Sequence, residues 1–144
     1  MITSKSDVIE GLTLWPADAP DQPLMAVATY RREDPFALRL VFLARDGRTT
    51  CDYLFARELV ADALLEECTG PVGAGEVTVR PADGPAWLVL SLPGPELGEP
   101  FELLASRDRL AAIVEATYQV VPPGRERDLV DLDALVADLL GAIS

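Results

Sequence analysis

The sequence predicts an α+β fold in which an antiparallel sheet packs against helices. Strand-like runs occupy most of the first half, helix-like segments close the chain, and another helix-like segment separates two groups of strands. Because apolar strands and helices each need a second layer to cover them, this order favours a mainly antiparallel sheet with helices on it. The loops are short and no internal repeat is visible, so we expect a single domain, 1–144.

The first half has the pattern of a strand meander. Leu24–Arg31 is rich in residues that favour strands. Turns are expected at Asp34-Pro35, where proline restricts the backbone, and at residues 45–48, which have hairpin composition. The expected strands are 7–14, 24–31, 36–43 and 49–55. Within the third strand, alternation places four apolar side chains on one face, namely Phe36, Leu38, Leu40 and Phe42.

The second half combines strands with helices. A helix is expected over Arg57–Glu67, where apolar residues recur at helical spacing, and Gly70-Pro71 ends it. Ser106 is a suitable N-cap for a second helix, which breaks at Pro122-Pro123. The expected strands here are 75–80, 86–92 and 101–104. Asp131 would cap a last helix, whose apolar stripe needs a surface to cover it and comprises Leu132, Leu135, Val136, Leu139, Leu140 and Ile143.

The acidic charge limits the partners. Twelve basic residues against 24 acidic ones give a formal charge of −12. Nucleic-acid affinity depends on Lys and Arg that displace counterions from phosphate, so nucleic acid is not an expected partner. The chain opens without a charged-then-apolar leader, and no apolar run approaches the roughly 20 residues that a membrane span requires. We therefore expect no membrane insertion and a cytoplasmic location.

Catalytic side chains are scarce. The sequence has no histidine, which removes histidine-based triads and imidazole metal sites. Cys51 lies in an expected strand and is interpreted as a buried, inert thiol, whereas Cys68 is expected to be more accessible. One acidic cluster comprises Glu126, Asp128, Asp131 and Asp133, and helix capping explains Asp131 and Asp133 better than a bound ion does. We therefore expect no enzymatic activity, no cofactor and no metal site.

Three large aromatic residues bear on possible interfaces. Trp87 lies inside an apolar strand and is interpreted as part of the core. Trp15 and Tyr118 lie near the ends of their elements. Because tyrosine and tryptophan are enriched where proteins meet, both residues are candidates for facing a partner.

Four local motifs follow one another from Tyr30 to the C-terminus. The first is Tyr30 with Asp34-Pro35-Phe36-Ala37-Leu38 and Phe42, and the second is Phe55-Ala56-Arg57-Glu58-Leu59-Val60. The third is Gly73-x-Gly-x-Val-x-Val79 with Pro81, and the fourth runs from Thr117 and Val121-Pro122-Pro123-Gly124 to Glu126 and Asp131-Leu132-Asp133. Together they resemble the SsgA-like family, the sporulation-specific cell-division proteins of filamentous actinobacteria. Departures from the family pattern at Tyr53, Arg80 and Ala116 indicate a divergent paralogue.

The resemblance implies a Whirly-like fold, with antiparallel sheets packed with helices, assembled as a homotrimer. It implies a non-catalytic adaptor in sporulation-linked septation that acts on cell-division proteins such as FtsZ and concentrates at division septa. For Arg57 two roles stay open, pairing with an acid or facing a neighbouring subunit. The positions that match the family motifs, as structural or interface residues, are Tyr30, Asp34, Pro35, Phe55, Arg57, Pro122, Gly124 and Asp131.

Two other classes of function remain as alternatives. A Whirly-like frame also suits a module that binds single-stranded nucleic acid, although a charge of −12 removes the attraction on which such binding depends. An enzyme or small-ligand carrier would need a deep pocket with clustered titratable groups. No acid pair in the sequence stands out as such a cluster.

Overall fold

Seven strands and two helices make up most of the structure, a computed structural model that describes residues 6–44, 49–73, 75–94, 100–129 and 141. A short 3₁₀ helix, η2 (Glu126–Leu129), follows the second helix. The helices are α1 (Arg57–Ala63) and α2 (Arg107–Val120). The strands are β1 (Val8–Pro16), β2 (Leu24–Arg31), β3 (Asp34–Leu43), β4 (Thr49–Ala56), β5 (Thr78–Pro81), β6 (Trp87–Leu92) and β7 (Phe101–Ser106).

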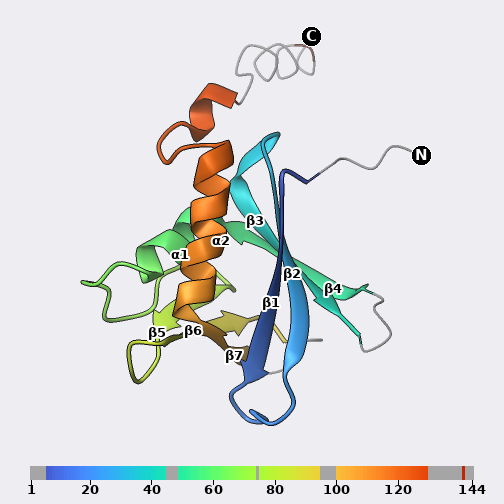
Figure 1. The fold of residues 1–144 in the computed structure, drawn as a ribbon, viewed down its shortest axis with the longest axis vertical. Helices are drawn as coiled ribbons and strands as arrows, with labels where there is room; N and C mark the ends of the chain where they lie inside the picture. The colour runs from blue at the N-terminus through green and yellow to red at the C-terminus, as the bar shows by residue number, and fades with distance from the viewer. Residues whose placement is uncertain (1–5, 45–48, 74, 95–99, 130–140, 142–144) are drawn as a thin grey trace.

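The strands form one antiparallel sheet in the order β4-β3-β2-β1-β7-β6-β5. Two meanders, β1–β4 and β5–β7, join where the end of β1 pairs with β7, so that Leu14 faces Ala105 and Pro16 faces Leu103. The sheet curls, and both helices lie on the same side of it, with α2 in front of the strands (Figure 1). The predicted α+β class with an antiparallel sheet is confirmed, and the architecture is Whirly-like.

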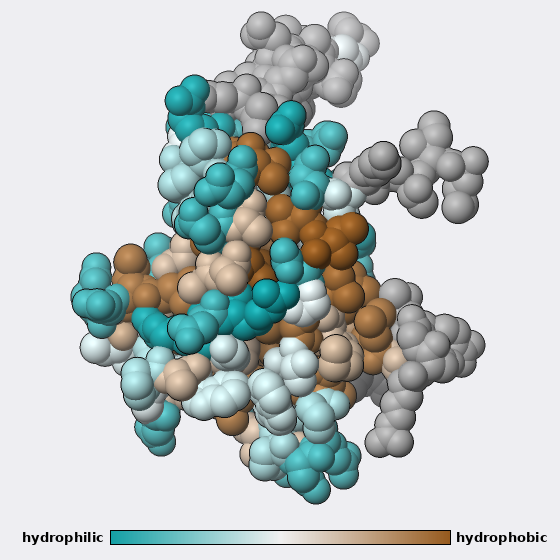
Figure 2. All heavy atoms as spheres, in the orientation of Figure 1, coloured by the Kyte–Doolittle hydropathy of each residue, from teal (hydrophilic) through white to brown (hydrophobic). Residues whose placement is uncertain are grey.

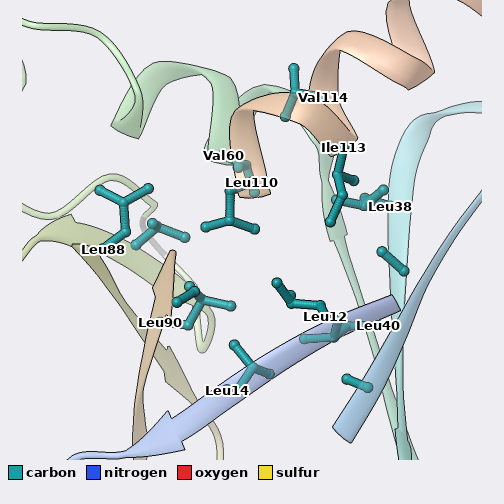
Figure 3. Packing of buried hydrophobic residues seen from close by; sticks show 14 of the residues in the cluster. Leu12, Leu14, Leu38, Leu40, Val60, Leu88, Leu90, Leu110, Ile113 and Val114 are labelled. Atoms are coloured by element: carbon teal, nitrogen blue, oxygen red, sulfur yellow. The ribbon is translucent and has the colours of Figure 1, made fainter. Parts of the chain in front are cut away.

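The core lies between the curled sheet and the helices. Alternate side chains of each strand point to the same face, and Figure 3 shows side chains from β1, β3 and β6 directed toward those of α1 and α2. Burying one such aliphatic side chain contributes about 1.5–3 kcal/mol. The labelled residues of this layer, all buried, are Leu12, Leu14, Leu38, Leu40, Val60, Leu88, Leu90, Leu110, Ile113 and Val114.

The turn between β2 and β3 lies one step earlier than the sequence predicts. Arg32 and Glu33 form it, while Asp34 already pairs with Arg31 inside the sheet. The next ladder pair is Thr29 with Arg39, so β3 bulges between these two pairs. The bulge accommodates Pro35, which has no N–H to donate to the ladder. It also breaks the alternation of the strand, and Phe36 is exposed instead of sharing a face with Leu38.

Other boundaries moved for tertiary reasons. The first helix ends at Ala63 rather than at Glu67, and Arg107 of α2 donates a hydrogen bond to the carbonyl of Leu64 at that point. The last strand continues to Ser106, whose hydroxyl then accepts from the Arg109 N–H as the predicted N-cap of α2. The helix expected after Asp131 lies outside the described residues.

The interpretation of Cys51 as buried is wrong, because its side chain is exposed. Cys51 pairs with Phe42 and therefore points to the same face as the core. It lies, however, near the start of β4, at the end of the sheet opposite to the one where α1 begins. Cys68 is half-buried, and its thiol donates to the carbonyl of Gly70.

Candidate functional site

Arg57 is the most deeply buried charged residue among those described, with 1% of its surface exposed. It is the first residue of α1 and follows directly on β4. Its guanidinium lies over two aromatic rings, 5.2 Å from the centroid of Tyr30 and 4.8 Å from that of Tyr118. Such cation–π contacts gain strength where water is excluded. We call Arg57 and the residues it contacts (Tyr30, Thr117, Tyr118, Val121 and Glu126) the Arg57 cluster.

The guanidinium also caps the carboxyl end of α2. One terminal nitrogen donates to the carbonyl of Val121 at 2.7 Å and lies 3.4 Å from that of Thr117. The last carbonyls of a helix lack partners within the helix and carry partial negative charge. The last turn of α2 has no basic residue of its own. Arg57 therefore supplies from another element the positive charge that this helix end requires.

Glu126 completes the neutralisation of Arg57. Its Oε1 accepts from the second terminal nitrogen at 2.5 Å and from the Gly124 N–H at 2.9 Å, and only 6% of the residue is exposed. Burial alone would raise the pKa of Glu126, but the hydrogen bonds from Gly124 and Arg57 outweigh it and lower the pKa below the ordinary value of 4.5. Gly124 has a φ of +84°, a conformation that favours glycine at this turn.

The two tyrosines bind the cluster to the sheet and to α2. The Tyr30 hydroxyl donates to the carbonyl of Pro35 at 2.8 Å, across the bulge between β2 and β3. Burial raises the pKa of both Tyr30 and Tyr118, although the nearby Arg57 cation lowers it. Both phenols are therefore protonated at neutral pH. The ring face of Tyr118, a candidate partner-facing residue, is occupied by Arg57, and the side chain is half-buried.

A second arginine repeats this arrangement at the other helix. Arg107 begins α2 directly after β7 and donates to the Leu64 carbonyl at the end of α1. Each helix thus receives its carboxyl-terminal cation from the first residue of the other. Both junctions have the same local pattern, a strand, a small residue, an arginine and an acid, as Ala56-Arg57-Glu58 and Ser106-Arg107-Asp108. The two strand-to-helix junctions are built alike, although no repeat is visible in the sequence.

The structure brings most of the family-motif positions to one end of the sheet. Tyr30 and Arg57 lie in the Arg57 cluster, Pro35 accepts from Tyr30, and Gly124 donates to Glu126. Phe55 is half-buried and packs against the core, and Pro122 is exposed in the segment that Arg57 fastens. Asp34 is half-buried at the start of β3. Asp131 lies outside the described residues.

Sequence reasoning did not pair Arg57 with Glu126, and it did not connect Arg107 with the end of the first helix. The two members of the pair are 69 residues apart, so no local spacing connects them. One signal was available: an arginine begins each helix, where a cation is unfavourable for its own helix, and this indicates a partner elsewhere.

Trp15 and Trp87 meet on the face of the sheet that the helices do not cover. Trp87 was interpreted as core, and this is wrong: its neighbour Leu88 points into the core, so Trp87 points away from it. The two indole rings pack edge to face, with centroids 5.2 Å apart and planes at 85°. Both side chains are half-buried. Trp15 therefore retains surface on the outer face beside β7.

The geometry of the Arg57 cluster holds the end of α2 in place, and its charged groups are enclosed within the fold. The Glu126 carboxylate is held by Arg57 and Gly124, and the guanidinium is enclosed by two rings and two carbonyls. Within the described residues, no group of three or more Cys, Asp or Glu is placed to hold a metal ion. In the same part of the chain, no helix has the length and apolar character to cross a membrane.

These features define a class of protein: a Whirly-like α+β domain whose curled sheet carries two helices that arginines lock to each other. Residues 24–126 match the family described as the Streptomyces sporulation and cell division protein SsgA. The chain belongs to this SsgA-like family. Proteins of this family are non-catalytic cell division proteins.

Curated relatives agree with this assignment. The chain is 35% identical over 138 residues to the sporulation-specific cell division protein SsgB of Kineococcus radiotolerans, which covers 93% of this chain and 79% of that protein. It is 37% identical over 123 residues to SsgB of Saccharopolyspora erythraea, and this match covers 84% of this chain and 82% of that protein.

Solved structures show the same fold. An SsgB structure from work on mutations that correlate with longitudinal cell division during sporulation of Streptomyces coelicolor superposes with a TM-score of 0.72. The identity is 28%, with 85% of this chain and 94% of that chain covered. The structure of the SsgA-like sporulation-specific cell division protein of Thermobifida fusca also superposes with a TM-score of 0.72. Its sequence identity is 26%, and the match covers 95% of this chain and 98% of that chain.

Proposed function

We propose that this chain is a non-catalytic adaptor in sporulation-specific cell division, which recruits or positions division machinery such as FtsZ by protein–protein contact at division septa. The observation that carries the proposal is the family match over residues 24–126, to a family of sporulation and cell division proteins. The Arg57 cluster supports it, because both terminal nitrogens of the buried Arg57 and the Glu126 carboxylate find partners inside the fold, which leaves the outer surface for other proteins.

The motif residues are proposed to act mainly through this internal fastening. Tyr30, Pro35, Arg57 and Gly124 hold the end of α2 and the following segment against β2 and β3. Because the ladder between β1 and β7 joins both meanders into one sheet, residues 1–144 are proposed to act as a single domain. The motif residues would then decide the shape of the adaptor, and other residues would contact the partner.

Self-association as a trimer is the second part of the proposal. Ile9, Thr29, Arg39 and Leu54 lie opposite one another across β1 to β4 and form a row on the outer face. Ile9 is 66% exposed and Leu54 is 61% exposed, which leaves apolar surface at both ends of the row. Apolar residues also gather over β1 and β2 beside α2 in Figure 2. A surface of this kind is suited to a second copy.

Light scattering tests the trimer. We expect a molar mass three times that of the chain, and a single-chain mass for a variant with Ile9→Glu and Leu54→Glu together. Leu65→Glu is the matched control, since Leu65 is also exposed but follows α1, away from this row. A wild-type protein with the mass of one chain would contradict the trimer.

Co-sedimentation with FtsZ polymers from the same host tests the adaptor. We expect the chain to pellet with polymers formed in GTP and to stay in the supernatant without them. Labelled single-stranded DNA tests the alternative function in the same preparation. Because the chain carries a charge of −12, we expect no binding of DNA even at low salt. Binding to DNA without binding to FtsZ would replace the proposed function by the alternative.

A further inference from the structure

The face of the sheet that carries the core continues beyond the helices at the end opposite the Arg57 cluster. Leu24 pairs with the core residue Leu14, Phe101 pairs with Leu92, and Tyr53 pairs with Leu40, so all three side chains share the core face. The described helices pack elsewhere, and Leu24 and Phe101 remain exposed. This end, where β1 turns into β2, is the lower end in Figure 1.

A cavity of about 650 Å³ occupies this uncovered end. Its lining includes Pro16, Leu24, Phe42, Cys51, Tyr53 and Phe101, and we call it the open-end groove. Phe42 and Tyr53 form an edge-to-face pair, with ring centroids 5.8 Å apart. A second hollow of about 380 Å³ shares Pro16, Leu24 and Phe101 with it. The volume is in the range of sites that bind ligands or large side chains of a partner.

The rim of the groove is acidic. Asp21 lines the open-end groove, and Asp18 and Glu102 line the adjoining hollow. Among the described residues that line either cavity, none is basic. Glu102 pairs with Arg80 at 2.6 Å, whereas Asp18 and Asp21 have no ion pair with another described residue. In the part of the chain that the structure describes, the groove therefore combines an apolar floor with negative charge at its mouth.

We propose that the open-end groove binds a short peptide segment of a partner protein, one that carries large apolar side chains beside lysine or arginine. The apolar side chains would enter between Leu24 and Phe101, and the basic residue would lie near Asp18 and Asp21. Apolar anchors and complementary charge are the usual components of peptide recognition. The proposal rests on the adaptor function and assigns the surface that this function uses.

Charge and chain path argue against other occupants. A second copy of the chain is assigned to the row from Ile9 to Leu54 on the outer face of β1 to β4, and not to this groove. The segment after Leu129 carries Asp131, Asp133 and Asp138, and Arg57 fastens the chain leading to it at the opposite end of the sheet. A fatty acid would bring a carboxylate to a rim that already carries acids. A basic, apolar peptide meets both the floor and the rim.

Selection of random peptides displayed on phage tests the proposal without assuming a sequence. We expect the enriched peptides to combine aromatic or aliphatic residues with Lys or Arg. A fluorescent synthetic copy of one such peptide then gives a dissociation constant by anisotropy. Leu24→Glu and Phe101→Glu should each weaken binding by about tenfold or more, because each removes an apolar anchor and adds a repelling charge.

Matched variants separate the groove from the rest of the surface. Leu65→Glu should leave binding unchanged, since Leu65 is 48% exposed against 49% for Phe101 but lies after α1. Asp18→Ser with Asp21→Ser should weaken binding by about two- to fivefold and reduce its dependence on salt. In a Cys68→Ser background, bound peptide should slow the reaction of the exposed Cys51 with maleimide. Circular dichroism confirms that each variant is folded.

The outcomes distinguish this proposal from the adaptor function. If wild type and Phe101→Glu pellet equally with FtsZ polymers, the adaptor stands and the groove assignment is overturned. If the peptide binds at the groove but FtsZ does not pellet the chain, the groove stands and FtsZ is the wrong partner. Enrichment of acidic peptides, binding of decanoate in preference to the peptide, or no peptide enriched by wild type over Phe101→Glu overturns the groove proposal.

Discussion

The core-facing side of the β1–β4 meander is covered at one end and exposed at the other. At the end where α1 begins, the Arg57 cluster fills that face, and its guanidinium contacts a carboxylate and two aromatic rings. At the other end, Leu24 and Phe101 of the open-end groove are left uncovered. The Arg57 cluster fastens the carboxyl end of α2 at one of these ends only. The difference separates a part that maintains the fold from a part available to partners.

Among variants that test this comparison, removal of Arg57 should lower the stability most. Arg57→Met leaves the Glu126 carboxylate buried without its partner and uncaps the end of α2. We expect the free energy of unfolding, measured with urea, to fall by about 3–5 kcal/mol. Arg39→Met is the matched control, because the Arg39–Asp52 pair is exposed, and it should cost less than about 1 kcal/mol. Equal losses in the two variants would show that the Arg57 cluster does not fasten this end.

Glu126→Gln should have the next largest effect on stability. The size of this effect should depend on pH. Hydrogen bonds to charged groups contribute about 1.5–3 kcal/mol, so we expect a loss of this size at neutral pH. Since the pKa of Glu126 is lowered from 4.5 in the folded protein, its stabilisation is complete above pH 4.5 and is lost as the pH falls through the lowered pKa.

Urea unfolding of wild type and Glu126→Gln at a series of pH values measures this dependence. The difference in the free energy of unfolding should therefore shrink below pH 4.5. A difference that stays constant down to the acid limit of folding would contradict the lowered pKa.

A pair of tyrosine variants compares the two ends directly. The Tyr30 hydroxyl donates to the Pro35 carbonyl in a buried site, and the Tyr53 hydroxyl donates to the Pro93 carbonyl in a partly exposed one. Tyr30→Phe should lower the free energy of unfolding by about 1–2 kcal/mol, since the buried carbonyl loses its partner. Tyr53→Phe should cost less than about 0.5 kcal/mol, because water can replace the hydroxyl. Thermal melts followed by circular dichroism decide the order, and the reverse order would contradict the contrast.

Substitution at the mouth of the groove should have the smallest effect on stability. Phe101→Ser and Leu24→Ser remove side chains that are exposed in the isolated chain. We expect the free energy of unfolding to change by no more than about 0.5 kcal/mol. A loss above about 2 kcal/mol, the range of core deletions, would show that this end belongs to the core.

Local patterns predicted many elements well. Leu24–Arg31 is a strand over the predicted range, and Ser106 caps α2 as predicted. Both features depend on side chains that are close in the chain. The strand follows from β-favouring residues along one segment, and the cap follows from a hydroxyl that accepts from the N–H three residues later. The bulge that exposes Phe36 was missed, because it arises from the pairing of β3 with β2 and not from β3 alone.

The sequence by itself determined the α+β class, the order of the elements, the acidic charge and, through four spaced motifs, the family. Those properties depend on composition and on neighbours close in the chain. Only the tertiary structure decided that Arg57 pairs with Glu126, 69 residues away, that β1 joins β7, and that Cys51 lies exposed at an open end of the core face. Contacts between distant segments follow from how the sheet curls and where the helices pack, which no local pattern of side chains records.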